Sequence, residues 1–194
     1  MIIGIYGYIA SGKSTASKYI EEKFKFKHIN ADEVAKQTIN SEESINVIKE
    51  TFPEVVVDEK VNKELLKEIV FQDADKNKIF TTAFWPIVNK KIVEIIEESG
   101  ESNFVIESIG LNSLDIEFDL VFFIKAPKEV IFKRLFKRNK TWKKEEVYQI
   151  LKIQKKIFDR KKLPEIKIET SGIVEELYEM INFYINKYMK KLGK

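Results

Sequence analysis

Eight residues near the start of the chain have types and a spacing that suit phosphate binding. They run from Gly7 to Ser14 and satisfy the pattern Gly-x-x-x-x-Gly-Lys-Ser without a mismatch. The glycines allow the backbone to curl so that successive N–H groups point inward, and a following helix adds the positive end of its dipole. A chance glycine-rich turn is the alternative, and the position of the pattern between an apolar run and a helical pattern argues against it. The pattern predicts a nucleoside triphosphate site with these binding residues: Gly7, Ala10, Ser11, Gly12, Lys13, Ser14 and Thr15.

Three side chains of this loop have distinct expected roles. Lys13 can reach the β- and γ-phosphates, the hydroxyl of Ser14 can bind Mg²⁺, and Thr15 is well placed for the α-phosphate. The pattern therefore predicts ATP and Mg²⁺ as ligands and leaves the phosphate acceptor open.

Two carboxylates follow predicted strands. Asp32 comes just after a short strand at His28-Ile29, where it could orient an acceptor hydroxyl and accept its proton. The alternative is a helix cap, since Asp is a good N-cap residue. Glu107 ends the apolar run Phe104-Val105-Ile106, where it could hold Mg²⁺ directly or through water. An ordinary charge at the end of a strand is the alternative for Glu107.

A basic segment lies in the second half of the chain. Residues 133–162 contain 13 Lys and Arg against 3 Asp and Glu, although the whole chain carries a net charge of only +3. Arg134 and Arg138 are spaced i, i+4 and so share a helix face, and arginine can hold phosphate oxygens in a bidentate way. We expect both to act in catalysis, on a lid that closes over ATP and offsets charge in the transition state. A solvated basic helix and a nucleic-acid site are the alternatives, but no nucleic-acid-binding module accompanies the charge.

Two further polar residues interrupt apolar patterns. Gln154 stands on the apolar face of a predicted helix over 143–158, so it can reach an internal site. His28 lies inside a predicted strand, and we expect it to be structural.

The composition excludes several classes of protein. The chain has 194 residues, no cysteine and one histidine, so thiol chemistry, disulfides and a multi-histidine zinc site are ruled out. Its longest strongly apolar run, Leu120 to Ile124, is too short to span a bilayer. The first residues lack the cationic region of a signal peptide, so we expect a cytoplasmic protein without a membrane or nucleic-acid partner.

Strands and helices alternate along the sequence. Short apolar runs predict strands at 2–6, 28–29, 103–109, 119–125 and 166–169. Helices are expected at 14–22, from 31 onward, and at 42–50, 62–72, 79–98, 126–137, 143–158 and 173–190, with a boundary or kink at Trp85-Pro86. This order predicts an α/β fold with a parallel sheet, whose ligands bind beyond the carboxyl ends of the strands.

The residues described so far resemble those of bacterial dephospho-CoA kinases. The resemblance is carried by two stretches, GIYGYIASGKSTASKYIEEKFKFKHINADEVAKQ and VIFKRLFKRNKTWKKEEVYQILKIQKK. The stretch VNKELLKEIVFQD followed by Trp-Pro, and Ser171-Gly172 before the last helix, also fall in family order. It implies a single domain over 1–194 with the three-layer P-loop kinase fold, a five-stranded parallel sheet, a helical acceptor-binding insertion near 40–100 and a lid near 139–163. It also implies transfer of the γ-phosphate of ATP to the 3′-hydroxyl of dephospho-CoA, the last step of CoA synthesis. By position, Lys13, Asp32, Arg134 and Arg138 match catalytic residues of the family.

The sequence departs from the family pattern mainly on the acceptor side. Tyr8 replaces a glycine, Asn30 an aspartate and Trp85 a histidine, and Lys63 stands where arginine is common. The residues 108–113 also differ from the family's usual Pro-Leu-Leu-Phe-Glu. We expect the acceptor to contact these residues: Tyr8, Asp32, Trp85 and Gln154.

Two other functions remain open on the sequence alone. The chain could be another small-molecule P-loop kinase acting on a nucleoside, shikimate-like or sugar hydroxyl, which the substituted acceptor residues favour. It could also be a non-catalytic nucleotide-dependent binding protein, but its retention of Lys13, Ser14, Asp32 and both lid arginines argues against this. The sequence does not indicate an oligomeric state.

Overall fold

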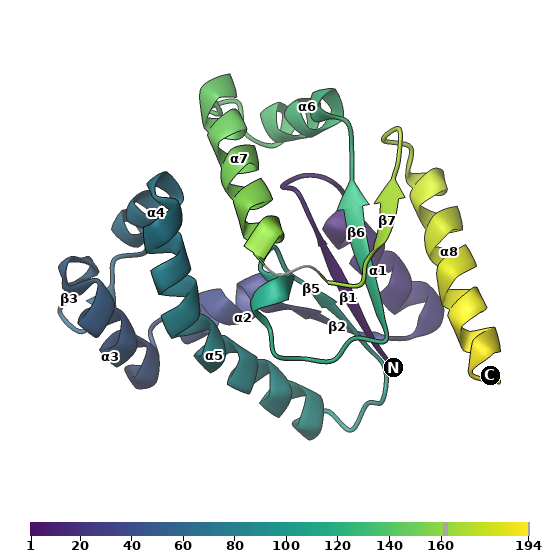
Figure 1. Cartoon of the computed structure of the whole chain (residues 1–194), viewed down its shortest axis with the longest axis horizontal. Helices are drawn as coiled ribbons and strands as arrows, with labels where there is room; N and C mark the ends of the chain where they lie inside the picture. Colours follow the sequence, from purple (N-terminus) through teal and green to yellow (C-terminus); the bar gives the residue numbers. More distant parts are fainter. Residues whose placement is uncertain (161–162, 194) are drawn as a thin grey trace.

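A five-stranded parallel sheet forms the centre of the molecule (Figure 1). The computed structural model describes residues 1–160 and 163–193. Its strands lie in the order β2-β5-β1-β6-β7. Their bounds are Ile2–Gly7 for β1, Lys27–Asn30 for β2, Phe104–Glu107 for β5, Leu120–Lys125 for β6 and Ile166–Glu169 for β7. The predicted parallel sheet is therefore confirmed.

Side chains alternate between the two faces of this sheet because successive residues of a strand point in opposite directions. In β1, Ile3 and Ile5 pack on one face, whereas Tyr6 packs on the other. In β6, Phe122 joins the first face and Phe123 the second. Both faces are buried, which explains why these strands read as continuous apolar runs.

Helices cover each face. Helices α1 (Lys13–Phe24) and α8 (Val174–Lys191) pack on the face of Ile3 and Ile5. The side chains of the other face belong to one apolar cluster with a second group of elements, of which α3 and α4 pack on α5. The bounds of these elements are Ala31–Thr38 for α2, Glu42–Thr51 for α3, Pro53–Val55 for η1, Val56–Val57 for β3, Lys60–Val61 for β4, Lys63–Gln72 for α4, Ala74–Glu98 for α5 and Leu111–Ser113 for η2.

Helices α6 (Lys128–Arg138) and α7 (Lys144–Arg160) lie at the carboxyl end of the sheet, at the top of Figure 1. They pack against each other through Ile131, Leu135, Val147 and Leu151, and against the loop that follows β1. The region near 139–163, expected to be a lid, falls mostly on α7, and its residues 161 and 162 lie outside the described part of the chain.

Two features differ from what the sequence indicated. Helix α5 runs from Ala74 to Glu98 with Pro86 inside it, so the helix has no boundary at Trp85-Pro86. Phe84, Val88 and Ile92 are buried on both sides of Pro86, and this packing stabilises the helix where proline removes a hydrogen bond. The antiparallel pair β3–β4 was not expected, because each of its strands has only two residues. Among the described helices, none combines the length and apolarity needed to cross a membrane.

Candidate active site

The loop between β1 and α1 approaches the neighbouring strand closely. At Gly7 φ is +154°, and a Cβ atom there would lie 2.2 Å from the carbonyl oxygen of Ile124. At Gly12 φ is +115°, in the left-handed region that favours glycine. Gly12 is also the N-cap of α1 and offers no side chain to its first N–H groups. These N–H groups therefore remain available for an anionic ligand.

Lys13 is the buried cation of this loop. Only 8% of the residue is exposed, and its Nζ donates a hydrogen bond of 3.1 Å to the carbonyl oxygen of Tyr8. Burial lowers the pKa of Lys13, while Asp32 and Glu107 act in the opposite direction. Lys13 is thus a poorly hydrated ammonium group beside two carboxylates, and a phosphate could replace the carbonyl oxygen as its partner.

Asp32 follows β2 and faces the residues after β5. Its carboxylate accepts hydrogen bonds from the Ser108 hydroxyl at 2.9 Å and from the Ile109 N–H at 3.2 Å. Burial raises the pKa of Asp32, and Lys13 and these hydrogen bonds oppose that rise without cancelling it.

The helix-cap alternative for Asp32 is wrong. Helix α2 has Asn30 as its N-cap, and the Asn30 side chain accepts a hydrogen bond from Glu33 N at 3.1 Å. Asn30, which departs from the family pattern, therefore has a capping role, and Asp32 is left free for another role.

Glu107, the last residue of β5, lies between Ser14 at the start of α1 and His28 in β2. The Ser14 hydroxyl donates a hydrogen bond of 2.6 Å to Glu107 Oε1. His28 Nε2 lies 3.3 Å from Glu107 Oε2, in a geometry that leaves both atoms buried without a hydrogen-bond partner. Burial tends to raise the pKa of Glu107, but His28, Ser14 and Lys13 outweigh it and hold that pKa below its usual value. The expectation that His28 is structural fits its place behind this carboxylate.

This arrangement fits a magnesium ion that also takes oxygens from a nucleotide. Ser14 Oγ and an ionised Glu107 are hard oxygen donors, and Ser14 Oγ lies 2.6 Å from Glu107 Oε1, so both oxygens could reach one ion. No cluster of three or more His, Cys, Asp or Glu that could hold a metal occurs in residues 1–160 and 163–193. Mg²⁺ commonly binds through one or two protein groups plus phosphates and water, so two protein donors are sufficient.

Arg134 holds the phosphate loop from behind. Its guanidinium donates hydrogen bonds to the carbonyl oxygens of Ala10 at 3.0 Å, Ser11 at 3.2 Å and Gly172 at 3.2 Å. Arg138, one turn later, is exposed and lies near enough to Lys13 to lower its pKa. The two arginines thus have different surroundings, which their shared spacing did not indicate.

Gln154 and Tyr8 connect α7 with the phosphate loop. Only 2% of Gln154 is exposed, and its Oε1 accepts a hydrogen bond of 2.9 Å from Ile9 N. The Tyr8 ring packs edge-on against Phe158 of α7, at 5.1 Å between ring centroids. Gln154 does reach an internal site, as its place on the apolar face predicted, and its partner there is the loop backbone.

Trp85 is part of the core beside η2. It is 9% exposed, and a Cβ atom at Gly110 would lie 2.8 Å from its Cζ2 atom. The indole and Gly110 therefore fit each other closely. In this structure Trp85 and Gln154 make contacts with the protein itself, so their predicted contact with the acceptor remains a prediction.

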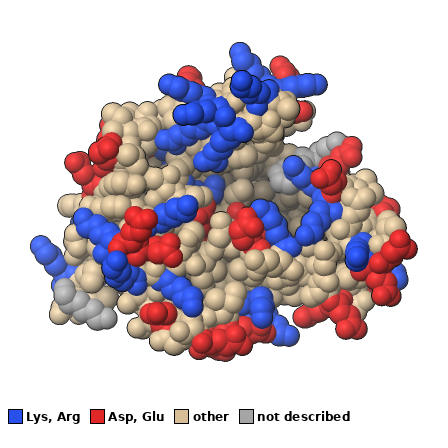
Figure 2. Space-filling model, turned by 180° about the vertical axis from the view of Figure 1, so that it is seen from behind, with Lys and Arg blue, Asp and Glu red and all other residues tan. Residues whose placement is uncertain are grey.

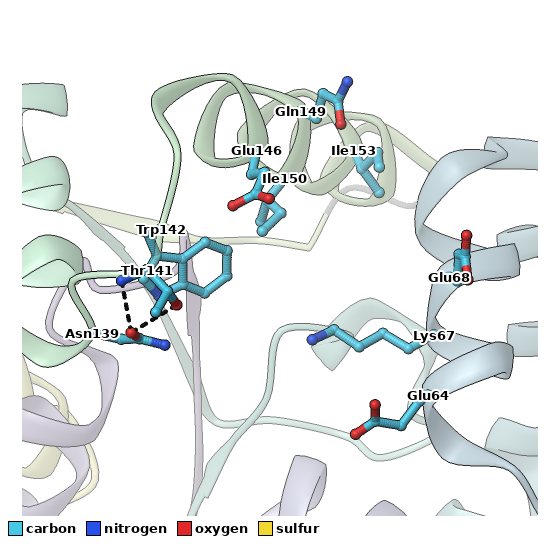
Figure 3. A pocket seen from close by; sticks show the side chains of 10 residues that line it. All are labelled: Glu64, Lys67, Glu68, Asn139, Thr141, Trp142, Glu146, Gln149, Ile150 and Ile153. Carbon is cyan, nitrogen blue, oxygen red and sulfur yellow. Dashed lines mark hydrogen bonds between the residues drawn. The ribbon is translucent and has the colours of Figure 1, made fainter.

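A cleft of about 510 Å³ separates α7 from α4 (Figure 3). Glu64, Lys67 and Glu68 of α4 lie on one side and Trp142 on the other. Asn139 Oδ1 accepts hydrogen bonds from the Thr141 N–H and hydroxyl, which shapes the turn before Trp142. The remaining lining residues are Glu146, Gln149, Ile150 and Ile153. Sequence reasoning missed this cleft, because α4 and Trp142 are far apart in the chain and only the tertiary fold brings them together.

A model of the dephospho-CoA kinase family matches residues 1–176. The chain belongs to the dephospho-CoA kinase family. Its relatives include the dephospho-CoA kinase of Borreliella burgdorferi, at 31% identity over 87% of this chain and 83% of that one. Another is that of Fusobacterium nucleatum, at 30% identity over 93% of this chain and 95% of that one. As a member of a kinase family, the protein is an ATP-dependent kinase, as the sequence predicted.

Solved structures place this dephospho-CoA kinase family member among P-loop kinases by fold. The Thermus thermophilus protein TT1252 has a TM-score of 0.73 at 22% identity and covers 96% of this chain and 97% of its own. The dephospho-CoA kinase from Campylobacter jejuni has a TM-score of 0.51 at 23% identity, with 96% of each chain covered. Shikimate kinase from Aquifex aeolicus has a TM-score of 0.52 at 20% identity over the whole of both chains. The expected P-loop kinase fold is thus confirmed.

Proposed function

We propose that the protein transfers the γ-phosphoryl group of ATP to the 3′-hydroxyl of dephospho-CoA, giving CoA and ADP. The observation that carries this proposal is the position of Asp32. It lies after β2 beside Lys13, is held by Ser108 and Ile109, and is not needed as a helix cap. A carboxylate there can orient an acceptor hydroxyl while the loop holds the phosphates.

These positions support the following roles in the reaction. The free N–H groups at the start of α1 and the ammonium of Lys13 bind the phosphates of ATP. Asp32 accepts the proton of the acceptor hydroxyl, whose oxygen attacks the γ-phosphorus as the bond to ADP breaks. Arg138, exposed near Lys13, is placed to offset the charge that develops on the transferred group.

Ser14 and Glu107 would hold Mg²⁺ in this reaction. A magnesium ion there would neutralise charge on the β- and γ-phosphate oxygens. The hydrogen bond from Ser14 and the neighbouring His28 keep Glu107 ionised, and an ionised carboxylate is the form that binds a cation.

The cleft between α7 and α4 is the place we propose for the acceptor, between the lid and the helical insertion (Figure 3). Trp142 offers an aromatic face on which an adenine can stack, and Lys67 offers a cation for the pyrophosphate. Lys and Arg side chains also gather at the top of the molecule, where α6 and α7 lie (Figure 2). Both substrates are polyanions, so this charge complements them. A reaction that consumes ATP and an intracellular cofactor precursor belongs in the cytoplasm.

An ATP-consumption assay with a panel of acceptors, with products identified by mass, tests this function. We expect conversion of dephospho-CoA to CoA and little product from adenosine, shikimate or gluconate. Heat-inactivated protein and a reaction without acceptor are the controls. Turnover of another acceptor by folded protein that ignores dephospho-CoA would refute the proposed substrate.

A further inference from the structure

A second cavity, of about 570 Å³, lies on the opposite face of α7 from the cleft in Figure 3. Glu146, Gln149, Ile150 and Ile153 line the cleft. Tyr148, Leu151, Lys152 and Lys155 line the second cavity, and at 3.6 residues per turn the two sets point to opposite sides of the helix. The start of α6 and Tyr8 of the phosphate loop complete its wall.

The interior of this cavity is apolar. Ala126, Ile131 and Leu151 contribute to it, and Ile131 and Leu151 belong to the buried cluster between α6 and α7. The Tyr148 ring packs against that of Phe132, at 5.0 Å between ring centroids, but Tyr148 remains 54% exposed. An aromatic residue left this open beside an apolar cavity offers a surface that a ligand could cover.

Four lysines surround these apolar groups, and most of their charge is not matched by the protein. Lys125 pairs with Glu169 at 2.8 Å. Lys128, Lys152 and Lys155 are exposed and have no ion-pair partner within the described residues. Three cations that approach one cavity from two helices repel one another, and an anion between them would relieve that repulsion.

We propose that this cavity binds a small amphipathic anion, with an apolar or aromatic body inside and a carboxylate or phosphate between the lysines of α6 and α7. The apolar body would rest on Ile131, Leu151 and Tyr148. The head group would lie between Lys128 of α6 and Lys152 and Lys155 of α7. A carboxylate and a phosphate are both suitable, because a lysine ammonium group binds either oxyanion as a point charge.

Such a ligand would stabilise α7 against α6. Helix α7 also carries Gln154, which contacts the phosphate loop, and one wall of the acceptor cleft. The cavity is therefore connected to the active site through α7 and through Tyr8, which lines the cavity and follows Gly7 in the phosphate loop. Occupation of the cavity can be measured without turnover.

The proposal is tested by isothermal titration calorimetry of the full chain with four probes. Octyl phosphate and octanoate carry the two candidate head groups, inorganic phosphate has no apolar body, and octyltrimethylammonium has the opposite charge. We expect one or both octyl anions to bind at least about tenfold more tightly than inorganic phosphate or the cationic probe, because apolar burial and charge act together. Whichever anion binds more tightly identifies the head group.

Paired variants locate the binding. Lys152→Glu with Lys155→Glu reverses two charges at the cavity and should weaken octyl-anion binding at least about tenfold. Lys144→Glu with Lys156→Glu makes the same charge change at exposed positions of α7 that do not line the cavity. This control should change the affinity for the octyl anions less than about twofold. All four positions are exposed, so circular dichroism should show both proteins folded. Equal loss in both variants, binding of the cationic probe as tight as that of the anions, or no octyl-anion binding beyond that of inorganic phosphate would overturn the proposal.

Discussion

The substitution Asp32→Asn separates catalysis from folding at this site. Asparagine keeps the size of the side chain and one carbonyl oxygen, which can still accept the hydrogen bond from Ser108 that spans 2.9 Å. It loses the negative charge, the basicity and the second oxygen, which accepts from Ile109 N at 3.2 Å. The variant therefore removes the proposed base and leaves the packing in place.

The effect on stability should be small, because two contributions oppose each other. Losing one hydrogen bond to a carboxylate costs about 1.5–3 kcal/mol. However, burial raises the pKa of Asp32 above the value that this carboxyl has in the unfolded chain. At any pH above that unfolded-state pKa, the ionised carboxylate therefore destabilises the folded state. A neutral side chain no longer carries that penalty, so we expect the free energy of unfolding at pH 7 to change by less than about 1 kcal/mol.

The effect on turnover should be large. A general base contributes roughly 10²- to 10⁴-fold, and we expect kcat to fall by a factor in this range while the Kd for ATP stays within about threefold. The acid limb of the wild-type kcat profile should lie above the usual pKa of aspartate, since burial raises that of Asp32, and this limb should be absent from the variant.

Steady-state kinetics with dephospho-CoA, a nucleotide-binding titration and thermal unfolding together test this prediction. Asp32→Glu, which keeps the charge but moves the carboxylate, is the matched control and should retain the acid limb. If Asp32→Asn kept kcat within about threefold of wild type while folded, a role for Asp32 as base would be refuted.

Three other substitutions test the rest of the site. Lys13→Ala should lower kcat/KM about 10³-fold without unfolding the protein, as measured by kinetics and circular dichroism; near-normal activity would exclude its phosphate role. Glu107→Gln should raise the Mg²⁺ concentration for half-maximal activity at least about tenfold in a metal titration, and an unchanged metal requirement would contradict the proposed site. Gln154→Leu leaves the Ile9 N–H without its hydrogen-bond partner, so it should lower the free energy of unfolding by about 1–3 kcal/mol and raise the KM for ATP. Gln154→Glu keeps an acceptor oxygen and should bind ATP more like wild type.

The sequence predicted those features that depend on local patterns. Apolar runs located β1, β5 and β6 because these strands are buried on both faces, whereas the edge strands β2 and β7 are partly exposed and gave shorter apolar signals. The glycine spacing located the phosphate loop because Gly7 and Gly12 need unusual backbone angles. The path of α5 through Pro86 was not predictable in this way. It depends on the packing of Phe84 and Val88 against elements distant in the chain.

The same distinction applies to the site. The types of Asp32 and Glu107 and their places after strands were visible in the sequence, but their partners Ser108 and His28 were not. Asp119 likewise accepts a hydrogen bond from Ile2 N at 2.7 Å and from the Tyr188 hydroxyl at 2.8 Å, and both partners are far from it in the chain. The spacing of residues in the sequence can indicate which side chains are candidates for catalysis or binding. The hydrogen-bond partners of those side chains depend on the tertiary fold.

The contacts of Arg134 have a consequence for the geometry of nucleotide recognition. One planar guanidinium joins the carbonyl oxygens of Ala10 and Ser11 to that of Gly172, which lies in the connection between β7 and α8. The separation between the phosphate loop and that connection is therefore fixed by the width of a single side chain. A nucleotide that contacts both segments must therefore have a distance between its base and its phosphates that fits this fixed separation. This chain has 31 lysines and only 3 arginines. A lysine could not replace Arg134, because its single ammonium group lacks the planar set of N–H donors that contacts three carbonyl oxygens of two segments.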